Sequence, residues 1–378
     1  MINDIRIHLA IIMYMGGCLS LMIYNAIVIF HKRSIRRAML YNTDKWIKTI
    51  HQQLTDNIGT FTKKHEKHLV KSLSYVENLI AFSNALNYLK LEYGNNFYNE
   101  YMDMLVQRKI FLILAVAYKK KKNEERAYFA YFVAQHPLVA KNTGGICTHT
   151  IDTMVSYIES SDIYCRVNVL KALCTIGDIH GIINILQFFS DKFYFIHHKL
   201  LAEDLFSFAG DKEVLALYLW GKYKVWNNNI ILGVITFITM FSDGFTNAFL
   251  PVLQNPLANA EIRIAIIRYY SKYSFSPAQS ILVEYLNQTD NYDIAAEAAS
   301  ALRSHPGNVT TIALTSALQS DNWYVRYNAA ASLAELGEFS NSIINASPDS
   351  NSDAIQIIQY MVEHIGVEKH MNVSELII

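Results

Sequence analysis

The pattern of apolar residues between 321 and 338 has the period of a helix that buries one face. Residues 330–332 within this segment are small, so a second helix can approach closely, and Gly337 is placed to end the helix. The apolar stripe consists of Val325, Ala329, Leu333 and Leu336.

This helical pattern recurs upstream at nearly constant intervals. The equivalent positions are 33, 32, 32, 32 and 31 residues apart, and each lies in what we call an anchor helix. A second amphipathic segment follows each of the first five anchor helices, often after an Asp or Asn that can cap it. The chain therefore predicts a stack of two-helix repeats over 161–345. The anchor positions are Arg166, Lys199, Ile231, Arg263, Ala295 and Arg326.

The best copy resembles the HEAT repeat family, in the short bacterial form also found in phycobilisome lyase-like proteins. Residues 321–337 carry its D-x-x-x-V-R-x-x-A-A-x-x-L-x-x-L-G pattern, and 162–177 carry a weaker copy. The resemblance implies an all-α fold, an α-solenoid of helical hairpins, in which the repeated Arg is structural. The helix-ending glycines would be Gly177, Gly210 and Gly337. The third copy lacks the Arg, and Ala295 and Pro306 replace the Arg and Gly in the fifth.

The N-terminal region predicts a single transmembrane helix. Residues 9–30 are 22 residues without a charge, which is long enough to cross a bilayer, and they lack the polar face of a core helix. Only Arg6 precedes this span, whereas Lys32, Arg33, Arg36, Arg37, Lys45 and Lys48 follow it. Because positive flanks stay in the cytoplasm, residues 1–8 should form a short extracytoplasmic tail and the bulk of the chain should be cytoplasmic at the cell membrane.

Between the span and the repeats the sequence predicts more helices. Residues 31–60 form a basic juxtamembrane segment suited to contact anionic lipid at 31–48. Within 61–160 a helical, HEAT-like region should contain helices at 65–93, 96–118 and 124–135, with an earlier helix at 44–58. At the far end, 346–378 should supply a capping helix and a tail.

The composition favours helices, and the net charge has opposite signs in two parts of the chain. Pro and Gly number 6 and 15 of 378 residues, too few for many tight turns. Net charge is about +9 over 31–140 and about −9 over 141–378. Because no aromatic-interleaved basic patch dominates, nucleic-acid binding is not expected. The four cysteines form no C-x-x-C pair and are read as buried thiols.

Two short strings are the main candidates for chemistry. The stretch Thr175–Gly181 (TIGDIHG) contains the Asp-x-His-Gly string of calcineurin-like phosphoesterases, but the other metal ligands of that site do not follow. In the repeat register, Gly177 ends one helix and Asp178 caps the next, so we interpret the string as a turn. His65-Glu66-Lys67-His68 is one residue short of the H-E-x-x-H zinc motif. A Cys147–His149 pair lacks an identified third group. We expect no cofactor, metal site or catalytic residue.

The sequence therefore favours a membrane-tethered scaffold that binds a protein partner. We expect the second helices to line the concave face, which lies in the acidic half and would suit a basic segment. An accessory subunit of a membrane enzyme, for instance in envelope polysaccharide synthesis, is one setting. A lyase or isomerase like the phycobilin lyase group and a purely structural tether remain alternatives. The candidate partner contacts are Gln187, Tyr218, Gln254, Glu284, Tyr285 and Gln319.

Overall fold

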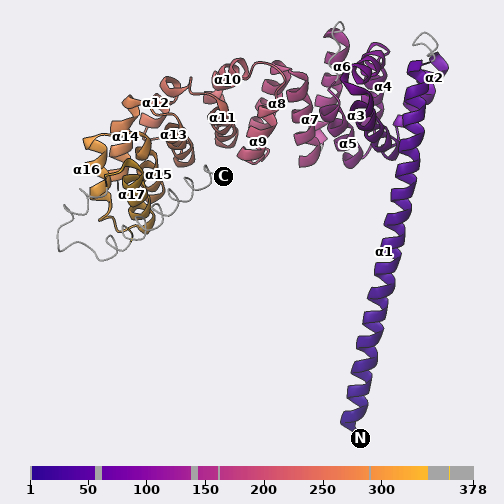
Figure 1. Cartoon of the computed structure of the whole chain (residues 1–378), viewed down its shortest axis with the longest axis horizontal. Coiled ribbons are helices and arrows are strands. Elements are labelled where there is room, and N and C mark those ends of the chain that lie inside the picture. Colours follow the sequence, from indigo (N-terminus) through magenta and orange to yellow (C-terminus); the bar gives the residue numbers. More distant parts are fainter. Residues whose placement is uncertain are drawn as a thin grey trace, which may run out of the picture. The chain divides into compact units, whose positions relative to one another are not determined.

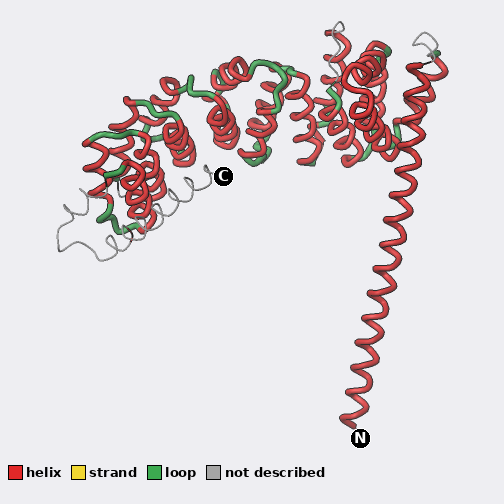
Figure 2. The backbone as a smooth tube through the Cα atoms, in the orientation of Figure 1, coloured by secondary structure: helices red, strands yellow, loops and turns green. Residues whose placement is uncertain are grey.

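The computed structural model describes residues 2–55, 62–137, 144–160, 162–288 and 291–338, and residue 357. Within these ranges every regular element is a helix (Figure 2), which confirms the all-α prediction. The chain divides into two compact units, Met1–Ile182 and Ile183–Ile378. The predicted capping helix in 346–378 lies outside the described residues.

A single long helix opens the first unit. Helix α1 (Ile2–Thr55) contains the whole apolar run and continues through the basic segment that follows it (Figure 1). It is the one helix of the described part that is long and apolar enough to cross a membrane, and its most apolar window is not buried inside the structure. The apolar run and the helix predicted at 44–58 are thus parts of one element.

The C-terminal end of α1 packs into the core of the first unit. Trp46 and Ile50 are buried, and the Trp46 ring meets Phe82 edge-on with 5.1 Å between ring centroids. Phe82 belongs to α3 (Val76–Gln107), and Tyr101 of the same helix donates a hydrogen bond to Gln53 Oε1 at 2.9 Å. The apolar run and the folded unit are therefore joined by continuous helix.

The remaining helices of the first unit pack in two layers. Helix α5 lies against α7 and α4 lies against α6, as consecutive hairpins of a repeat stack do. Asn168 on α7 donates to the carbonyl of Ala127 on α5 at 3.0 Å. Position 161, the predicted start of the repeats, is thus no boundary between compact units. The elements are α2 (Lys63–Leu73), α4 (Ile110–Lys119), α5 (Asn123–Gln135), α6 (Gly144–Val155), the 3-10 turn η2 (Ile158–Ser160) and α7 (Ile163–Ile176).

Two helices predicted in this region are each interrupted. The helix predicted at 65–93 breaks at Ser74–Tyr75, between α2 and α3. The helix predicted at 96–118 breaks at Lys109, which has a left-handed φ of 57°. The predicted break near 94 exists as a kink at Gly94, with φ 82°, inside α3.

The second unit consists of alternating second helices and anchor helices. Helix α8 (Ile179–Asp191) enters it from the first unit. The anchor helices are α9 (His198–Phe206), α11 (Asn228–Phe241), α13 (Ala260–Lys272), α15 (Tyr292–Ala301) and α17 (Trp323–Leu336). The second helices are α10 (Lys212–Trp220), α12 (Thr246–Gln254), α14 (Ser276–Asn287) and α16 (Asn308–Ala317), with 3-10 turns η3 (Tyr223–Val225) and η4 (Leu302–Ser304).

Asparagine caps fix where the anchor helices begin. Each of four anchor helices starts after an Asn whose side-chain oxygen accepts a backbone N–H of the first turn. The caps fall at the repeat spacing read from the sequence, which confirms the register. These residues are Asn227, Asn259, Asn291 and Asn322.

Small side chains allow neighbouring anchor helices of the second unit to approach closely. Gly233 on α11 lies so close to Leu201 of α9 that a Cβ there would approach the Leu201 side chain to 2.4 Å. Ala295, Ala298 and Ala299 on α15 are likewise buried in the stack. Because small residues let neighbouring helices approach closely, the anchor helices form the shorter, inner side of the curved row in Figure 1. The second helices lie on the outer side, so their predicted place on the concave face is wrong.

Candidate interaction surface

The predicted partner contacts divide between exposed and structural positions. Tyr218, Gln254, Glu284 and Gln319 are exposed, but they lie on or just after second helices, away from the concave side. Gln187 accepts a hydrogen bond from Trp226 Nε1 at 3.0 Å and donates one to Asp191 at 2.8 Å, so it links repeats.

Tyr285 is buried, so its predicted role as a partner contact is wrong and it belongs to the core. Its hydroxyl donates to the carbonyl oxygen of Leu253, and its ring lies 5.5 Å from the guanidinium carbon of Arg263. This stacked arrangement occupies the ring face that a partner would need.

The repeated arginines have structural contacts. Arg326 is buried, and its Nη1 donates to the carbonyls of Ser320 and Asp321 at 2.7 and 3.0 Å. It therefore fixes the connection that precedes its own helix. Arg166, at the equivalent position on α7, is half-buried, and Lys199 on α9 is exposed.

Two of the three predicted helix-ending glycines have that role. Gly177 and Gly337 end α7 and α17 with φ of 88° and 75°, where a side chain is disfavoured. The third, Gly210, has no positive φ, because α9 already ends at Phe206. A Cβ on Gly210 would instead contact the ring of Phe208.

The phosphoesterase-like string is a turn, as its interpretation predicted. The side chain of Asp178 accepts the backbone N–H of Gly181 at 3.0 Å, which caps α8. A Cβ on Gly181 would lie 2.4 Å from Asp178 Oδ2, so the cap itself requires glycine. His180 is exposed. Among the described residues no group of three His, Cys, Asp or Glu side chains could hold a metal ion.

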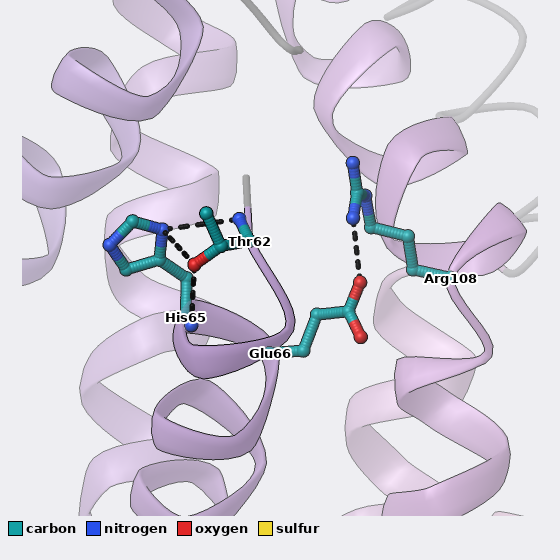
Figure 3. Close-up of polar contacts among 4 residues, drawn as sticks. All are labelled: Thr62, His65, Glu66 and Arg108. Carbon is teal, nitrogen blue, oxygen red and sulfur yellow. Dashed lines mark hydrogen bonds and ion pairs between the residues drawn. The ribbon is translucent and has the colours of Figure 1, made fainter. Parts of the chain in front are cut away.

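The His65–His68 string has capping and pairing roles at the start of α2. Thr62 Oγ1 accepts the backbone N–H of His65, and His65 Nδ1 lies 3.3 Å from the backbone nitrogen of Thr62 (Figure 3). Glu66 forms an ion pair with Arg108 at 2.6 Å. The Cys147 side chain lies outside the described part, and His149 is exposed.

The first unit contains a buried polar cluster that no sequence pattern predicts. His136 Nε2 lies 2.8 Å from Ser83 Oγ, and its Nδ1 lies 3.0 Å from the Tyr98 hydroxyl. Burial lowers the pKa of His136 to about 4, with a smaller contribution from Lys90, so the ring is neutral near pH 7. All three side chains are buried. The cluster resembles a nucleophile with its base, but its burial makes it a satisfied core network.

Exposed apolar side chains gather where second helices lead into anchor helices. We call this side of the second unit the connection edge, and it comprises residues 191–197, 221–227, 255–259, 291–293 and 320–324. Because the hairpins alternate in direction, all these connections lie at the same end of the anchor helices. Leu257 is 92% exposed and Tyr324 is 66% exposed. The exposed members are Phe193, Phe195, Val225, Leu257, Tyr292, Trp323 and Tyr324.

The opposite connections are polar. The described side chains at 207–211, 242–245, 273–275 and 302–307 include no exposed large hydrophobic residue. On the outer side, exposed apolar residues form separate groups on α10 and α16, with none on α12 or α14 between them. Exposed apolar residues also lie at the margins of the opposite connections, at Phe206 and Val309. Apolar exposure is thus most continuous from repeat to repeat along the connection edge.

A hollow of about 340 Å³ lies within the connection edge. It lies between the α10–α11 connection and the α12–α13 connection, and its lining includes Tyr223, Trp226 and Leu257. A side chain of another molecule that binds the connection edge could insert into this hollow.

Hydrogen bonds hold the first two connections of this edge together. Besides the Gln187–Trp226 bond, the backbone N–H of Asn227 donates to Ser190 Oγ at 2.7 Å, and Asn229 donates to the carbonyl of Ile196 at 2.5 Å. Phe193, 82% exposed, adopts a left-handed φ of 52°, which is unfavourable for an aromatic residue. These first two connections of the edge are therefore ordered, and Phe193 is held outward.

Comparison with known proteins supports the repeat fold. A HEAT repeat family model matches residues 313–340, which include the end of α16 and all of α17. A comparison with curated proteins found no relative that matches this chain. HEAT repeat proteins are typically non-catalytic scaffolds, so the match supports a helical scaffold or protein-interaction role.

Proposed function

We propose that this protein is a membrane-tethered helical scaffold that holds a protein partner on the connection edge of its second unit. The observation that carries the proposal is the continuity of exposed apolar residues along that edge, together with the hollow between two of its connections. Contiguous exposed apolar surface marks sites of interaction, because a soluble surface rarely retains it otherwise.

The chemistry of the edge indicates what the partner presents. Aromatic residues such as Trp323 and Tyr324 are enriched among the residues that dominate binding energy. Residues 183–338 carry a net charge of −4. The connection edge itself has three acids, Asp191, Asp293 and Asp321, and three bases, Lys192, Lys222 and Lys224. A partner segment with apolar side chains would therefore complement the edge, and the basic flanks expected from the sequence would meet acidic charge elsewhere in the unit.

The inner face of the anchor helices is a less favourable place for such a segment. Arg268 forms an ion pair with Glu297, and Arg303 pairs with Glu335 at 3.1 Å. Each of these two glutamates is thus compensated by an arginine of the preceding repeat. We therefore place the partner on the connection edge, with the inner face as its flank.

The membrane tether is the second element of the proposal. Helix α1 provides one apolar stretch, and six Lys or Arg follow it within 18 residues whereas a single Arg precedes it. This asymmetry supports a cytoplasmic position for both units. The scaffold would then keep its partner near the cytoplasmic membrane surface, as an accessory subunit of a membrane enzyme would.

Photo-crosslinking from single positions in intact cells tests this function. A photo-reactive amino acid in place of Leu257 or Tyr324 should give one crosslinked protein species of defined mass. The control position is Ile312, which is 71% exposed on α16 and off the edge. The proposal predicts the same adduct from both edge positions and its absence from Ile312. Equal adducts from all three positions, or none from the edge, would contradict it.

A further inference from the structure

A second hollow, in the first unit, has the chemistry of a ligand site. It encloses about 350 Å³ between the C-terminal end of α1, helix α2 and the start of α3. This volume is in the range of small-molecule pockets. Two glutamines, a threonine, a serine and a leucine complete a lining whose principal members are Asn42, Lys45, Trp46, His65, His68 and Asn78.

Among the described lining residues of this pocket, Lys45 carries the formal charge, and two histidines lie beside it. Lys45 reaches it from α1, and His65 and His68 reach it from α2, where a spacing of three residues places them on one face. The described lining contains no carboxylate. The acids that adjoin lining residues in sequence do not line the pocket, and they include Asp44, which is exposed, and Glu66, which is paired with Arg108. Figure 3 shows the Glu66 side chain directed away from His65. An anion entering the pocket therefore meets the Lys45 ammonium, and no carboxylate competes among the described lining residues.

The neutral lining residues add hydrogen-bond donors. Asn42 and the two glutamines carry amide groups and Ser72 carries a hydroxyl, whereas the Thr49 hydroxyl already donates to the carbonyl of Lys45 at 2.8 Å. Beside them, Trp46 and Leu69 are almost completely buried and form an apolar floor. A ligand that combines a many-acceptor anionic group with polar substituents on a compact body fits such a lining.

Part of the pocket wall is already held in place. His65 is fixed by its capping box with Thr62. Asn78 donates to the carbonyl of Ser72 at 3.1 Å, and Gln53 accepts the Tyr101 hydroxyl. Because these side chains are already ordered, less conformational entropy is lost when a ligand binds.

We propose that this pocket binds the phosphate group of a small phosphorylated molecule. A phosphate offers several acceptor oxygens to the Lys45 ammonium and to the ring N–H groups of the two histidines, and lysine is a common phosphate ligand. The site lies in the first unit, so its occupancy is independent of the partner proposed for the connection edge.

The position of the pocket along α1 favours a soluble ligand over a lipid headgroup. Lys45 follows the last residue of the apolar run, Phe30, by 15 residues, which is about 22 Å of helix at 1.5 Å per residue. The headgroup layer extends only about 6 Å beyond each side of the hydrocarbon core. A phosphorylated metabolite in the cytoplasm reaches the pocket more readily than the headgroup of a membrane lipid.

Calorimetric titration of the detergent-solubilised full chain tests the site. The probes are inorganic phosphate and glucose 6-phosphate, and Lys45→Glu is compared with Lys48→Glu. Lys48 is exposed on the same helix and does not line the pocket, so the two variants make the same charge change. We expect saturable 1:1 binding that Lys45→Glu weakens at least tenfold and Lys48→Glu leaves within twofold. Helical content and the melting temperature confirm that both variants fold.

A second arm separates the two sources of phosphate. The chain is reconstituted into nanodiscs of phosphatidylcholine alone or with phosphatidic acid, and protection of Lys45 from amine labelling is measured. Protection by glucose 6-phosphate in both nanodiscs supports a soluble ligand, and protection only with phosphatidic acid supports phosphate chemistry from lipid. If neither source protects Lys45, or if both Lys variants lose binding equally, the proposal is wrong.

Discussion

At the residue scale, many of the polar side chains that suggest chemistry in the sequence are structural links. Asp178 caps a helix, Arg326 holds a connection, and Gln187 joins two repeats. Their spacing predicts the first two roles, because caps and arginines recur with the repeat. The third role needs a partner 39 residues away, Trp226, which no local pattern identifies.

The buried His136 should make the first unit sensitive to acid. Its pKa is about 4 in the folded chain and about 6.5 when unfolded, so the unfolded state binds more protons between these values. Its stabilising contribution is complete above pH 6.5 and is lost as pH falls toward 4. At pH 5 the loss should be about 2 kcal/mol.

Urea unfolding at pH 7.5 and pH 5 measures this effect in the native chain and in His136→Gln. The difference between the two chains removes the contribution of His305, whose pKa burial also lowers. We expect the variant to lose about 2 kcal/mol less than the native chain between the two pH values. An identical loss in both chains would show that His136 does not titrate as described.

Several glycines of the second unit have no positive φ. Among these, Gly233 should tolerate a side chain least. Gly233→Ala would drive a Cβ into Leu201, and overpacking of this kind costs about 1–3 kcal/mol. Gly244→Ala is the matched control, because its Cβ would lie 3.4 Å from Ser242 Oγ. Thermal unfolding should show a lower melting temperature for Gly233→Ala. Equal melting temperatures would mean that α9 and α11 separate at little cost.

At the element scale, the sequence predicts helices well and their faces poorly. The repeat period located the anchor helices, and Asn caps confirm their register. The breaks at Ser74 and Lys109 were missed because neither Gly nor Pro marks them. The concave face was assigned to the wrong helices. An apolar stripe shows which side of a helix is buried, but curvature depends on contacts such as Gly233 with Leu201 between repeats.

The join between α1 and the first unit should depend on Ile50. Ile50→Ala removes a fully buried side chain, which costs about 2–5 kcal/mol in well-packed sites. Ile35→Ala, on an exposed part of the same helix, provides the control. Hydrogen exchange should rise in α3 for Ile50→Ala and remain native for Ile35→Ala. Unchanged exchange in both variants would contradict the packing of α1 on α3.

At the scale of the whole molecule, a candidate span and a repeat stack belong to one chain, and the candidate surface emerges only from their folding. The sequence shows Leu257 and Trp323 as isolated apolar residues in connections. Folding brings their connections to one edge, and the register of the repeats is sufficient to predict that shared edge. The hollow beside Leu257 could not be anticipated, because it depends on the gap left between two connections.

The tether predicts how the protein fractionates. The full chain should remain with membranes after alkaline carbonate extraction, whereas a chain lacking residues 2–30 should be soluble. A cysteine-reactive reagent that does not cross membranes should fail to label an exposed cysteine introduced at Leu257 in intact cells. Labelling in intact cells would place the second unit outside the cytoplasm.

The affinity of the crosslinked partner for purified variants shows whether the connection edge holds that partner. Leu257→Asp places a charge in the connection edge, and Ile312→Asp makes the same change at an exposed apolar site on α16. Loss of a residue that dominates binding costs about 2 kcal/mol or more, which is about thirtyfold in Kd. We expect that loss for Leu257→Asp and a native Kd for Ile312→Asp. A native Kd for Leu257→Asp, or equal weakening in both variants, would show that the edge does not hold the partner.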